Sequence, residues 1–431
     1  MIKKVISLIL CLLALTGFSA CSDSTAVGTK NKITTYTLKN WYSISEGNSI
    51  WNYNKHCKDS DKMIEIVEFE TEEELKNKLS TELMSGKGPD LISADCLSVA
   101  GISYEKLIDQ GCFVDINEVI KADTSQDQLN LSDYNEKALQ SGVINGKRYF
   151  IPFYFMPNFC VASQQELEKY INADTKSLSY NDIIKINDKI NEEKSDKVIS
   201  SNADGYIWSY VYDNVDFINK TYNFDGEFSS TAEKLKELKG TGDKIKEELL
   251  QEFVISPYQI YEYCAEIEKY GETARIIGKP SIDTDVLSAQ MCGIYFINKN
   301  SAKKQDILEF IKYALSEKEQ NDVAGTDIEK YDNTTSYYDG SYFPVNKKSY
   351  KSLMNNAKKL KYLDDTIKIS NESVEQLENM LAQISDFQFS QSTNYMTEVG
   401  SELISDYVDG KISISMFVED LKTKTKIYME E

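Results

Sequence analysis

A strand, a helix and a second strand follow one another early in this chain, and this succession constrains the fold more than any other feature. Residues 63–69 predict the first strand, and residues 89–92 predict the second, after a turn at Gly86. The helix between them begins at a capping box of Thr71 and Glu74, and one of its faces carries leucines at intervals of four residues: Leu75, Leu79 and Leu83. Strand, helix and strand in this order predict a parallel unit with a right-handed crossover, and hence the α/β class.

The alternation of strands and helices continues along the chain. Residues 32–38 predict an opening strand, and residues 293–298 predict a later strand followed by a helix that Ser301 caps. A further helix begins at Ser316, and the apolar spacing of residues 349–431 is largely helical. The 431 residues are more than one hydrophobic core usually serves, so we expect two lobes.

The first residues have the pattern of a secretory signal peptide. Lys3 and Lys4 precede an apolar run at residues 5–14, and small residues then lead to Cys21. The run is too short for a spanning helix, which takes about 20 apolar residues. We therefore predict a bacterial lipoprotein signal at residues 1–20 and a lipid on Cys21 that anchors the protein at the cell surface, on the outer face of the cytoplasmic membrane. An ordinary signal peptide with a fortuitous cysteine and an uncleaved anchor remain open alternatives.

The charge of the chain limits its partners. The net charge is -21, which argues against binding nucleic acid and against an electrostatic attraction to membranes. Among the 48 basic residues only Arg148 and Arg275 are arginine. Because the guanidinium group is the preferred partner of carboxylates and phosphates, anionic ligands are disfavoured unless one of these two lines the binding site.

Few residues are available for metal or nucleophilic chemistry. His56 is the only histidine, and it lies in a polar run, so histidine-based catalysis and most imidazole metal sites are disfavoured. Without Cys11 and Cys21, six cysteines with scattered spacing remain, which leaves disulfides or free thiols open: Cys57, Cys96, Cys112, Cys160, Cys264 and Cys292. We expect no metal and no cofactor. A carboxylate pair for glycoside hydrolysis stays open, since 69 acidic residues always offer pairs.

Five segments together resemble a known family, the extracellular solute-binding proteins of ABC importers, in the group that mostly carries sugars and oligosaccharides. They occur in the family's order over nearly the whole chain: residues 82–92 (ELMSGKGPDLI), residues 145–152 (NGKRYFIP), residues 299–304 (KNSAKK) with the helix and residues 316–320 after them, residues 342–346 (YFPVN), and residues 410–413 (GKIS) with the helix that follows. In the first segment Gly86 and Pro89 shape a turn and Asp90 is placed to accept local hydrogen bonds, so we assign these residues structural roles.

The resemblance implies a two-lobe, periplasmic-binding-protein-like fold of type II. Each lobe is expected to contain a mainly parallel sheet flanked by helices, with the ligand in a cleft between the lobes. Crossings between the lobes are expected near residues 153–158, near residues 290–297 and after about Val323. The predicted division is a signal peptide at 1–20, a tether at 21–31, an N-terminal lobe at 32–153 plus 297–325, and a C-terminal lobe at 154–296 plus 326–431.

Aromatic side chains are the expected ligand contacts. The chain has 28 Tyr, 17 Phe and 3 Trp, several of them clustered near predicted strand ends and crossings, where ring faces suit the C–H faces of sugars. The region around residues 253–258 (FVISPY) departs from the family pattern, and Tyr258 is predicted to take over a stacking role there. The predicted ligand-binding residues are Trp41, Asp95, Phe153, Tyr154, Trp208, Tyr258 and Tyr342.

The implied function is capture of a carbohydrate, an oligosaccharide by expectation, and its delivery to an ABC permease. The protein is then no enzyme, needs no cofactor, binds no nucleic acid, acts as a monomer and touches the membrane through its lipid. One alternative keeps the fold and gives it another use: a ligand-sensing or glycan-adhesion surface lipoprotein without a transport role.

Overall fold

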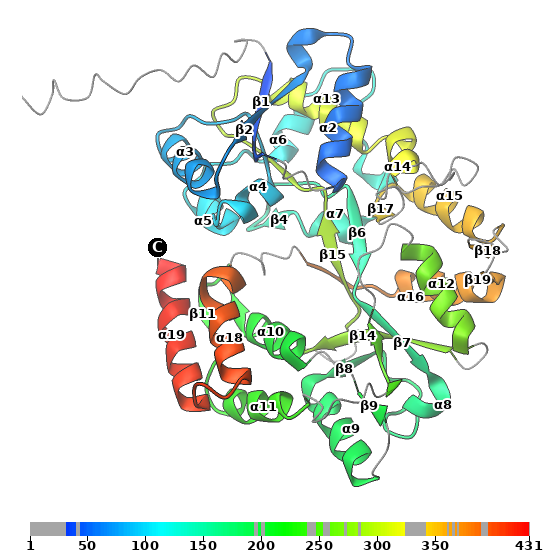
Figure 1. Cartoon of the computed structure of the whole chain (residues 1–431). Helices are drawn as coiled ribbons and strands as arrows, with labels where there is room; N and C mark the ends of the chain where they lie inside the picture. Colours follow the sequence, from blue (N-terminus) through cyan, green and yellow to red (C-terminus); the bar gives the residue numbers. More distant parts are fainter. Residues whose placement is uncertain are drawn as a thin grey trace, which may run out of the picture.

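The computed structural model describes residues 32–39, 44–193, 197–199, 203–238, 247–252, 259–270, 274–282, 286–323, 342–359, 362–363, 367–368, 370–388 and 395–430. Figure 1 shows two bodies, one above the other, with strands running between them. In each body helices pack around short strands, so the elements are of the α/β type.

The first body is the upper one in Figure 1. Its elements in chain order are β1 (Ile33–Leu38), α2 (Ile44–His56), η1 (Ser60–Lys62), β2 (Ile64–Phe69), α3 (Glu72–Met84), β3 (Leu91–Ser93), α4 (Ala94–Val99), α5 (Tyr104–Asp109), α6 (Ile116–Lys121), η2 (Leu131–Asp133), α7 (Glu136–Gln140), β4 (Val143–Ile144), β5 (Lys147–Arg148), β16 (Tyr295–Ile297), α13 (Lys304–Ala314) and α14 (Glu317–Val323). β1 and β2 pair in parallel along their whole lengths, and β3 pairs antiparallel with β16. The paired parallel strands are therefore β1 and β2, which α2 connects.

The helix predicted between the strands at residues 63–69 and 89–92 is α3, which follows β2 and precedes β3, and it forms for the expected reasons. The hydroxyl of Thr71 accepts a hydrogen bond from the backbone N–H of Glu74 at 3.2 Å, which caps the first turn. All three spaced leucines are buried: Leu75, Leu79 and Leu83. Gly86 has a φ of +72°, the left-handed conformation that ends the helix without strain in glycine.

Asp90 ties three distant segments together. Its Oδ2 accepts hydrogen bonds from the backbone N–H and the hydroxyl of Thr34, both at 3.0 Å, and its Oδ1 accepts one from the hydroxyl of Ser301 at 2.6 Å. Asn298 completes the junction by donating to the carbonyls of Lys87 and Pro89. The segments at residues 82–92 and 299–304 are thus in contact. The predicted structural role of Asp90 is confirmed, but the hydrogen bonds to its carboxylate come from Thr34 and Ser301 and not from the local turn.

The chain passes between the bodies at Asn158. This single residue separates β6 (Tyr154–Pro157) from β7 (Phe159–Ser163). β6 pairs with β15 (Ser288–Cys292) and β17 (Phe343–Pro344), whereas β7 pairs with β14 (Ala274–Ser281) and β13 (Gln251–Glu252). Two of the predicted crossings fall in this region, and the third, after about Val323, leads into residues outside the described part of the chain.

The second body is the lower one in Figure 1. Apart from β7, β13 and β14, it contains α8 (Gln164–Leu167), β8 (Ser177–Ser179), α9 (Tyr180–Glu192), β9 (Lys197–Val198), α10 (Ala203–Asp213), β10 (Val215–Asp216), β11 (Thr221–Tyr222), α11 (Glu227–Lys236), β12 (Glu247–Glu248), the π-helix η5 (Met396–Gly400), α18 (Ser401–Val408) and α19 (Ile414–Glu430). Beside the crossing strands lie α12 (Gln259–Tyr270), α15 (Lys347–Ala357), β18 (Tyr362–Leu363), β19 (Ile367–Lys368), α16 (Asn371–Ala382) and β20 (Asp386–Gln388).

Two hydrophobic cores support the two bodies. The first contains the buried faces of the upper body, the crossing strand β6, and also α12, α15 and α16. The second joins α9, α10 and α11 to α18 and α19. Residues 343–387 belong by prediction to the C-terminal lobe, but their buried side chains pack in the first core. The boundaries of the lobes stay a prediction.

Strand pairing is more mixed than the mainly parallel sheets expected for each lobe. In the sheet β17-β6-β15-β20 only the β15–β20 pair is parallel. The reason is that β6 and β15 carry the chain to and fro between the bodies, which makes them antiparallel neighbours. All six cysteines of the described residues are free thiols. In the same residues no helix has both the length and the apolar character to cross a membrane.

Candidate functional site

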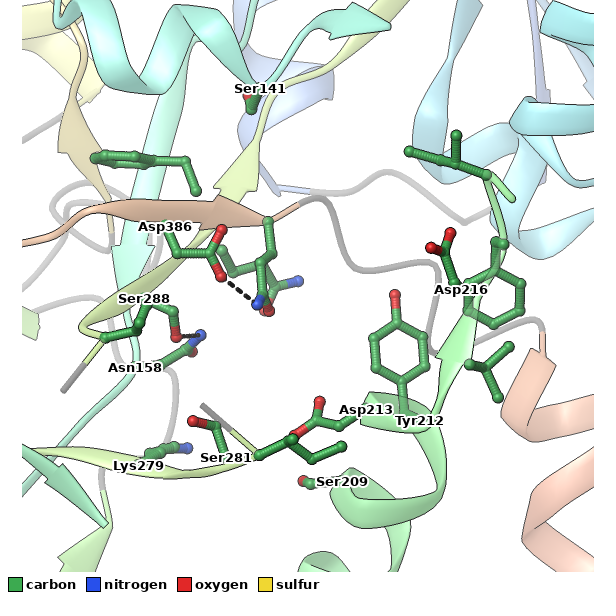
Figure 2. Close-up of a pocket in the computed structure, with 18 of the residues that line it drawn as sticks. Ser141, Asn158, Ser209, Tyr212, Asp213, Asp216, Lys279, Ser281, Ser288 and Asp386 are labelled. Carbon is green, nitrogen blue, oxygen red and sulfur yellow. Dashed lines mark hydrogen bonds between the residues drawn. The ribbon is translucent and has the colours of Figure 1, made fainter. Parts of the chain in front are cut away.

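A cleft of about 720 Å³ lies between the two bodies, next to the crossing strands. The upper wall comes from α5, the end of α7 and β4, and the lower wall from α10, β10 and β14. Figure 2 shows Ser141 on the upper side, Ser209, Tyr212 and Asp213 on the lower side, and Asn158 with Ser288 beside the crossing. Ligand sites of small molecules have volumes of roughly 300–1,000 Å³, so this cleft has the size of a binding site.

Helix α10 supplies the aromatic part of the lower wall. Trp208 and Tyr212, four residues apart on one helical face, both line the cleft. Tyr206 and Tyr210, on the opposite face, are buried in the second core. Tyr212 also lies 5.5 Å from Phe217, measured between ring centroids. The helix thus fixes two aromatic rings in the cleft by burying two others behind them.

Two isoleucines extend the apolar surface of the lower wall. The side chains of Ile218 and Ile282 line the cleft and are 49% and 44% exposed. Isolated exposed apolar residues are ordinary on protein surfaces, but these two line the same cleft as the rings of α10. The lower wall therefore offers apolar side chains to a ligand.

Polar groups also line the cleft. Asn158 donates a hydrogen bond to the hydroxyl of Ser288 at 3.1 Å, and Gln388 donates one to the carboxylate of Asp386, both drawn in Figure 2. On the lower wall the hydroxyl of Tyr180 donates to Asp213 at 2.8 Å. Amide, hydroxyl and carboxylate groups can each accept or donate further hydrogen bonds, so the cleft can bind a ligand with many hydroxyl groups.

Asp216, at the end of β10, is an ionised group that lines the cleft. Its carboxylate accepts hydrogen bonds from the backbone N–H of Asn219 at 2.9 Å and from the side-chain amide at 2.7 Å. Burial acts to raise the pKa of Asp216, but the hydrogen bonds from Asn219 lower it below its ordinary value. Asp216 therefore carries a negative charge at neutral pH.

Glu105 is a buried carboxylate in the upper wall. The residue is only 7% exposed, and its Oε2 accepts a hydrogen bond from the hydroxyl of Ser103 at 2.8 Å. Burial raises the pKa of Glu105, although the hydrogen bond from Ser103 acts in the opposite direction. An acidic side chain is rarely buried this far, and this one lines the cleft.

The sequence matches the family model of bacterial extracellular solute-binding proteins over residues 64–321, more than half of the chain. The chain belongs to this family. The resemblance found in the sequence is thereby confirmed. Among curated proteins none matches the sequence.

Solved structures share the fold of this solute-binding protein. An ABC substrate-binding protein from Listeria monocytogenes, in complex with cycloalternan, is 10% identical with a TM-score of 0.52 over 93% of this chain and 99% of that chain. The GacH receptor of Streptomyces glaucescens is 14% identical with a TM-score of 0.51 over 93% and 98%. A periplasmic oligogalacturonide binding protein from Yersinia enterocolitica is 14% identical with a TM-score of 0.52 over 93% and 99%. These likenesses confirm the two-lobe fold class.

Of the predicted ligand-binding residues, the structure brings Trp208 into the cleft. Asp95 lies in the first turn of α4, away from the residues that line the cleft. Tyr342 is half-buried and packs 5.9 Å from Tyr154, also away from the lining. Trp41, Tyr258 and the lipidation residue Cys21 lie outside the described residues.

Phe153 and Tyr154 are core residues in this structure. They are 1% and 0% exposed, and the ring of Phe153 contacts those of Tyr295 and Phe310 at 5.5 and 5.9 Å. A Cβ atom at Gly293 would lie 2.9 Å from the Cβ of Phe153, so this glycine makes room for the ring. The aromatic cluster at this crossing stabilises the junction of the bodies, and we do not include it in the candidate site.

The sequence analysis missed several lining residues, among them Asn158, Asp213, Asp216 and Asp386. Only Tyr212 had a usable signal, because it follows Trp208 by one helical turn. The others lie at the ends of short elements, where polar residues are common for many reasons. Within the part of the chain that the structure describes, no group of three histidine, cysteine or acidic residues is placed to hold a metal ion.

Proposed function

We propose that this protein captures a carbohydrate, specifically an oligosaccharide, in the cleft between its bodies and delivers it to an ABC permease. The observation that carries the proposal is the lining of the cleft, where Trp208, Tyr212 and two exposed isoleucines occur together with amide, hydroxyl and carboxylate groups. A sugar ring has the same division, with apolar C–H faces and a polar edge of hydroxyl groups. No bond is made or broken, and the ligand favours the closed arrangement of the lobes that a permease would recognise.

Two further features support a carbohydrate. The structural neighbours from Listeria, Streptomyces and Yersinia are named for, or were solved with, carbohydrate ligands. The cleft has a volume of about 720 Å³ and draws residues from both bodies and from β20, which suits a ligand of several rings rather than one.

We also propose that a lipid on Cys21 holds the protein at the outer face of the cytoplasmic membrane. The support is the charged start, the short apolar run and the cysteine that follows it in the sequence. Cell fractionation tests this step: the protein with its native cysteine should sediment with membranes, and Cys21→Ala should release it. Sedimentation of both forms alike would contradict the proposed anchor.

Titration calorimetry with a panel of neutral trisaccharides tests ligand capture. Binding of at least one member with a stoichiometry of one is expected, and Trp208→Ala should weaken it about tenfold or more, as loss of an aromatic contact at a binding site does. Trp51→Ala is the matched control, because Trp51 is 66% exposed and lies on α2, outside the cleft. Equal losses in both variants, or no saturable binding across the panel, would contradict the proposal.

A further inference from the structure

The cleft carries an excess of negative charge. Among the described residues that line it there are four carboxylates, Glu105, Asp213, Asp216 and Asp386, and one cation, Lys279. The carboxylates come from both walls and from β20, so a bound ligand faces negative charge from several sides. This distribution bears on which carbohydrates the proposed function includes.

Neither arginine of the chain is available to offset this charge. Arg148 is 8% exposed and donates hydrogen bonds to Asn117 and to the carbonyl of Leu139 in the upper body. Arg275 is 9% exposed and donates to the carbonyls of Asn172 and Thr175 in the lower body. Both guanidinium groups thus hold the backbone together, and neither lines the cleft. The sequence left anionic ligands open only if one of the two arginines lined the binding site. Neither of them does, so anionic ligands stay disfavoured.

The orientation of α10 adds to the negative field. Two of the residues of this helix that line the cleft, Tyr212 and Asp213, lie in its last turn, where the helix dipole places a partial negative charge. No basic residue occurs in the last turn to neutralise it. A carboxylate or sulfate bound over Tyr212 would therefore meet the unfavourable end of the helix as well as the side chain of Asp213.

We propose, on the basis of the proposed carbohydrate-binding function, that the cleft accepts neutral and cationic sugars and rejects sugars that carry carboxylate, sulfate or phosphate groups. Hydroxyl groups donate hydrogen bonds to the carboxylates at no charge penalty, and an ammonium group gains attraction from them. An anionic group adds a like charge to a partly desolvated site that has one lysine to receive it. The four carboxylates thus accept hydrogen bonds from the ligand and, by their charge, also determine which sugars bind.

A matched ligand series tests this inference by calorimetry. Maltotriose, cellotriose and mannotriose are each compared with the same trisaccharide oxidised at C6 to uronates and with its 6-amino form. For whichever backbone binds, the uronate form should bind at least tenfold more weakly than the neutral form in 50 mM salt, and the amino form at least as tightly. In 500 mM salt the difference in affinity between the uronate and neutral forms should shrink, because salt screens the repulsion between the ligand and the carboxylates of the cleft.

Charge-neutral variants connect the effect to the cleft. Asp216→Asn combined with Asp386→Asn should reduce the difference in affinity between the neutral and uronate forms severalfold. Glu72→Gln combined with Glu73→Gln removes the same charge from the exposed start of α3 and should leave this difference unchanged. Uronate binding equal to or tighter than neutral binding would overturn this inference and leave the proposed function intact. Absence of binding by every neutral, anionic and cationic form would overturn the proposed function and this inference with it.

Discussion

At the scale of single residues, Glu105 illustrates a cost that the binding site imposes on the fold. Its carboxylate is buried, and burial raises its pKa, so the folded state holds the proton more tightly than the unfolded state. The contribution of Glu105 to the free energy of unfolding is then most favourable at a pH below its ordinary pKa of about 4.3. This contribution falls as the pH rises through the higher pKa of the folded state. Above that window the charged form is a constant penalty.

Glu105→Gln should therefore be more stable than the native protein at pH 7, and this gain should shrink toward pH 4, where the native carboxyl is also protonated. Thermal unfolding at both pH values measures the difference. Asp420→Asn, a change at an exposed acidic residue of α19, serves as the control and should show no such gain. A gain of the same size at pH 4 would mean that charge burial is not its cause.

Asp90 connects separate segments of the upper body by hydrogen bonds. Three donors from Thr34 and Ser301 converge on its carboxylate, and hydrogen bonds to charged groups contribute about 1.5–3 kcal/mol each. Asp90→Ala should lower the free energy of unfolding by about 3 kcal/mol or more, as measured by urea titration. Asp420→Ala, at an exposed position of α19, should change it by less than about 0.5 kcal/mol. Comparable losses at the two positions would contradict the assigned role.

At the scale of elements, α3 shows the packing that its sequence pattern predicts. Leu79 is completely buried at the centre of the leucine face, so Leu79→Ala should destabilise the protein by about 2–5 kcal/mol through lost contacts and a residual cavity. Chemical denaturation provides the measurement. Met84→Ala on the same helix is the comparison, because Met84 is 77% exposed and should cost less than about 0.5 kcal/mol. A small loss of stability in Leu79→Ala would indicate that this helix packs differently.

The sequence predicted strongly patterned elements and failed where the pattern was local. α3 has its predicted cap and apolar face, and α13 and α16 form with buried apolar faces inside segments predicted to be helical. The cap predicted for α13 was wrong, because its N-cap is Lys303, which makes no side-chain capping hydrogen bond, and not Ser301. No helix was predicted around Trp208, although the aromatic residues of α10 repeat at helical spacing on two faces. The helical period determines which of these residues are buried. Residues four apart share a face of the helix, so one pair of aromatic residues is buried and the other pair lines the cleft, and no residue taken alone indicates this division.

At the scale of the whole molecule, the cleft is assembled from residues between Tyr104 and Gln388. Its members lie on separate elements of both bodies, and each is ordinary in its local sequence. The fold class could be predicted because family motifs mark turns and strand ends in the chain. The site could not, since it depends on the angle between two bodies and on which side of each crossing strand faces the ligand.

Contacts on the side of the cleft near α19 connect the two bodies directly. Lys76 of α3 pairs with Glu398 of η5 at 3.2 Å, and Lys220 pairs with Asp109 of α5 at 3.0 Å. Lys106 of α5 donates to the backbone carbonyl of Tyr428 near the end of α19, with its ammonium 5.0 Å from the ring centroid. Figure 1 places these elements opposite one another across the gap between the bodies. They can stabilise only an arrangement in which the bodies stand this close.

Replacing Lys76, Lys106 and Lys220 together with methionine should therefore shift the free protein toward a more open arrangement. Exposed ion pairs contribute up to about 1 kcal/mol each and the contact of Lys106 somewhat more, so a total near 2 kcal/mol corresponds to a roughly 30-fold change in the equilibrium between closed and open forms. Small-angle X-ray scattering should show a larger radius of gyration, and glycan affinity should fall, because ligand binding must then also supply the energy of closure. Lys358→Met is the control, since the partners of Lys358, Glu375 and Glu378, lie beside it in the same body. If the triple variant keeps both the native radius and the native affinity, these contacts do not set the angle between the lobes, and the strands at the crossing alone determine it.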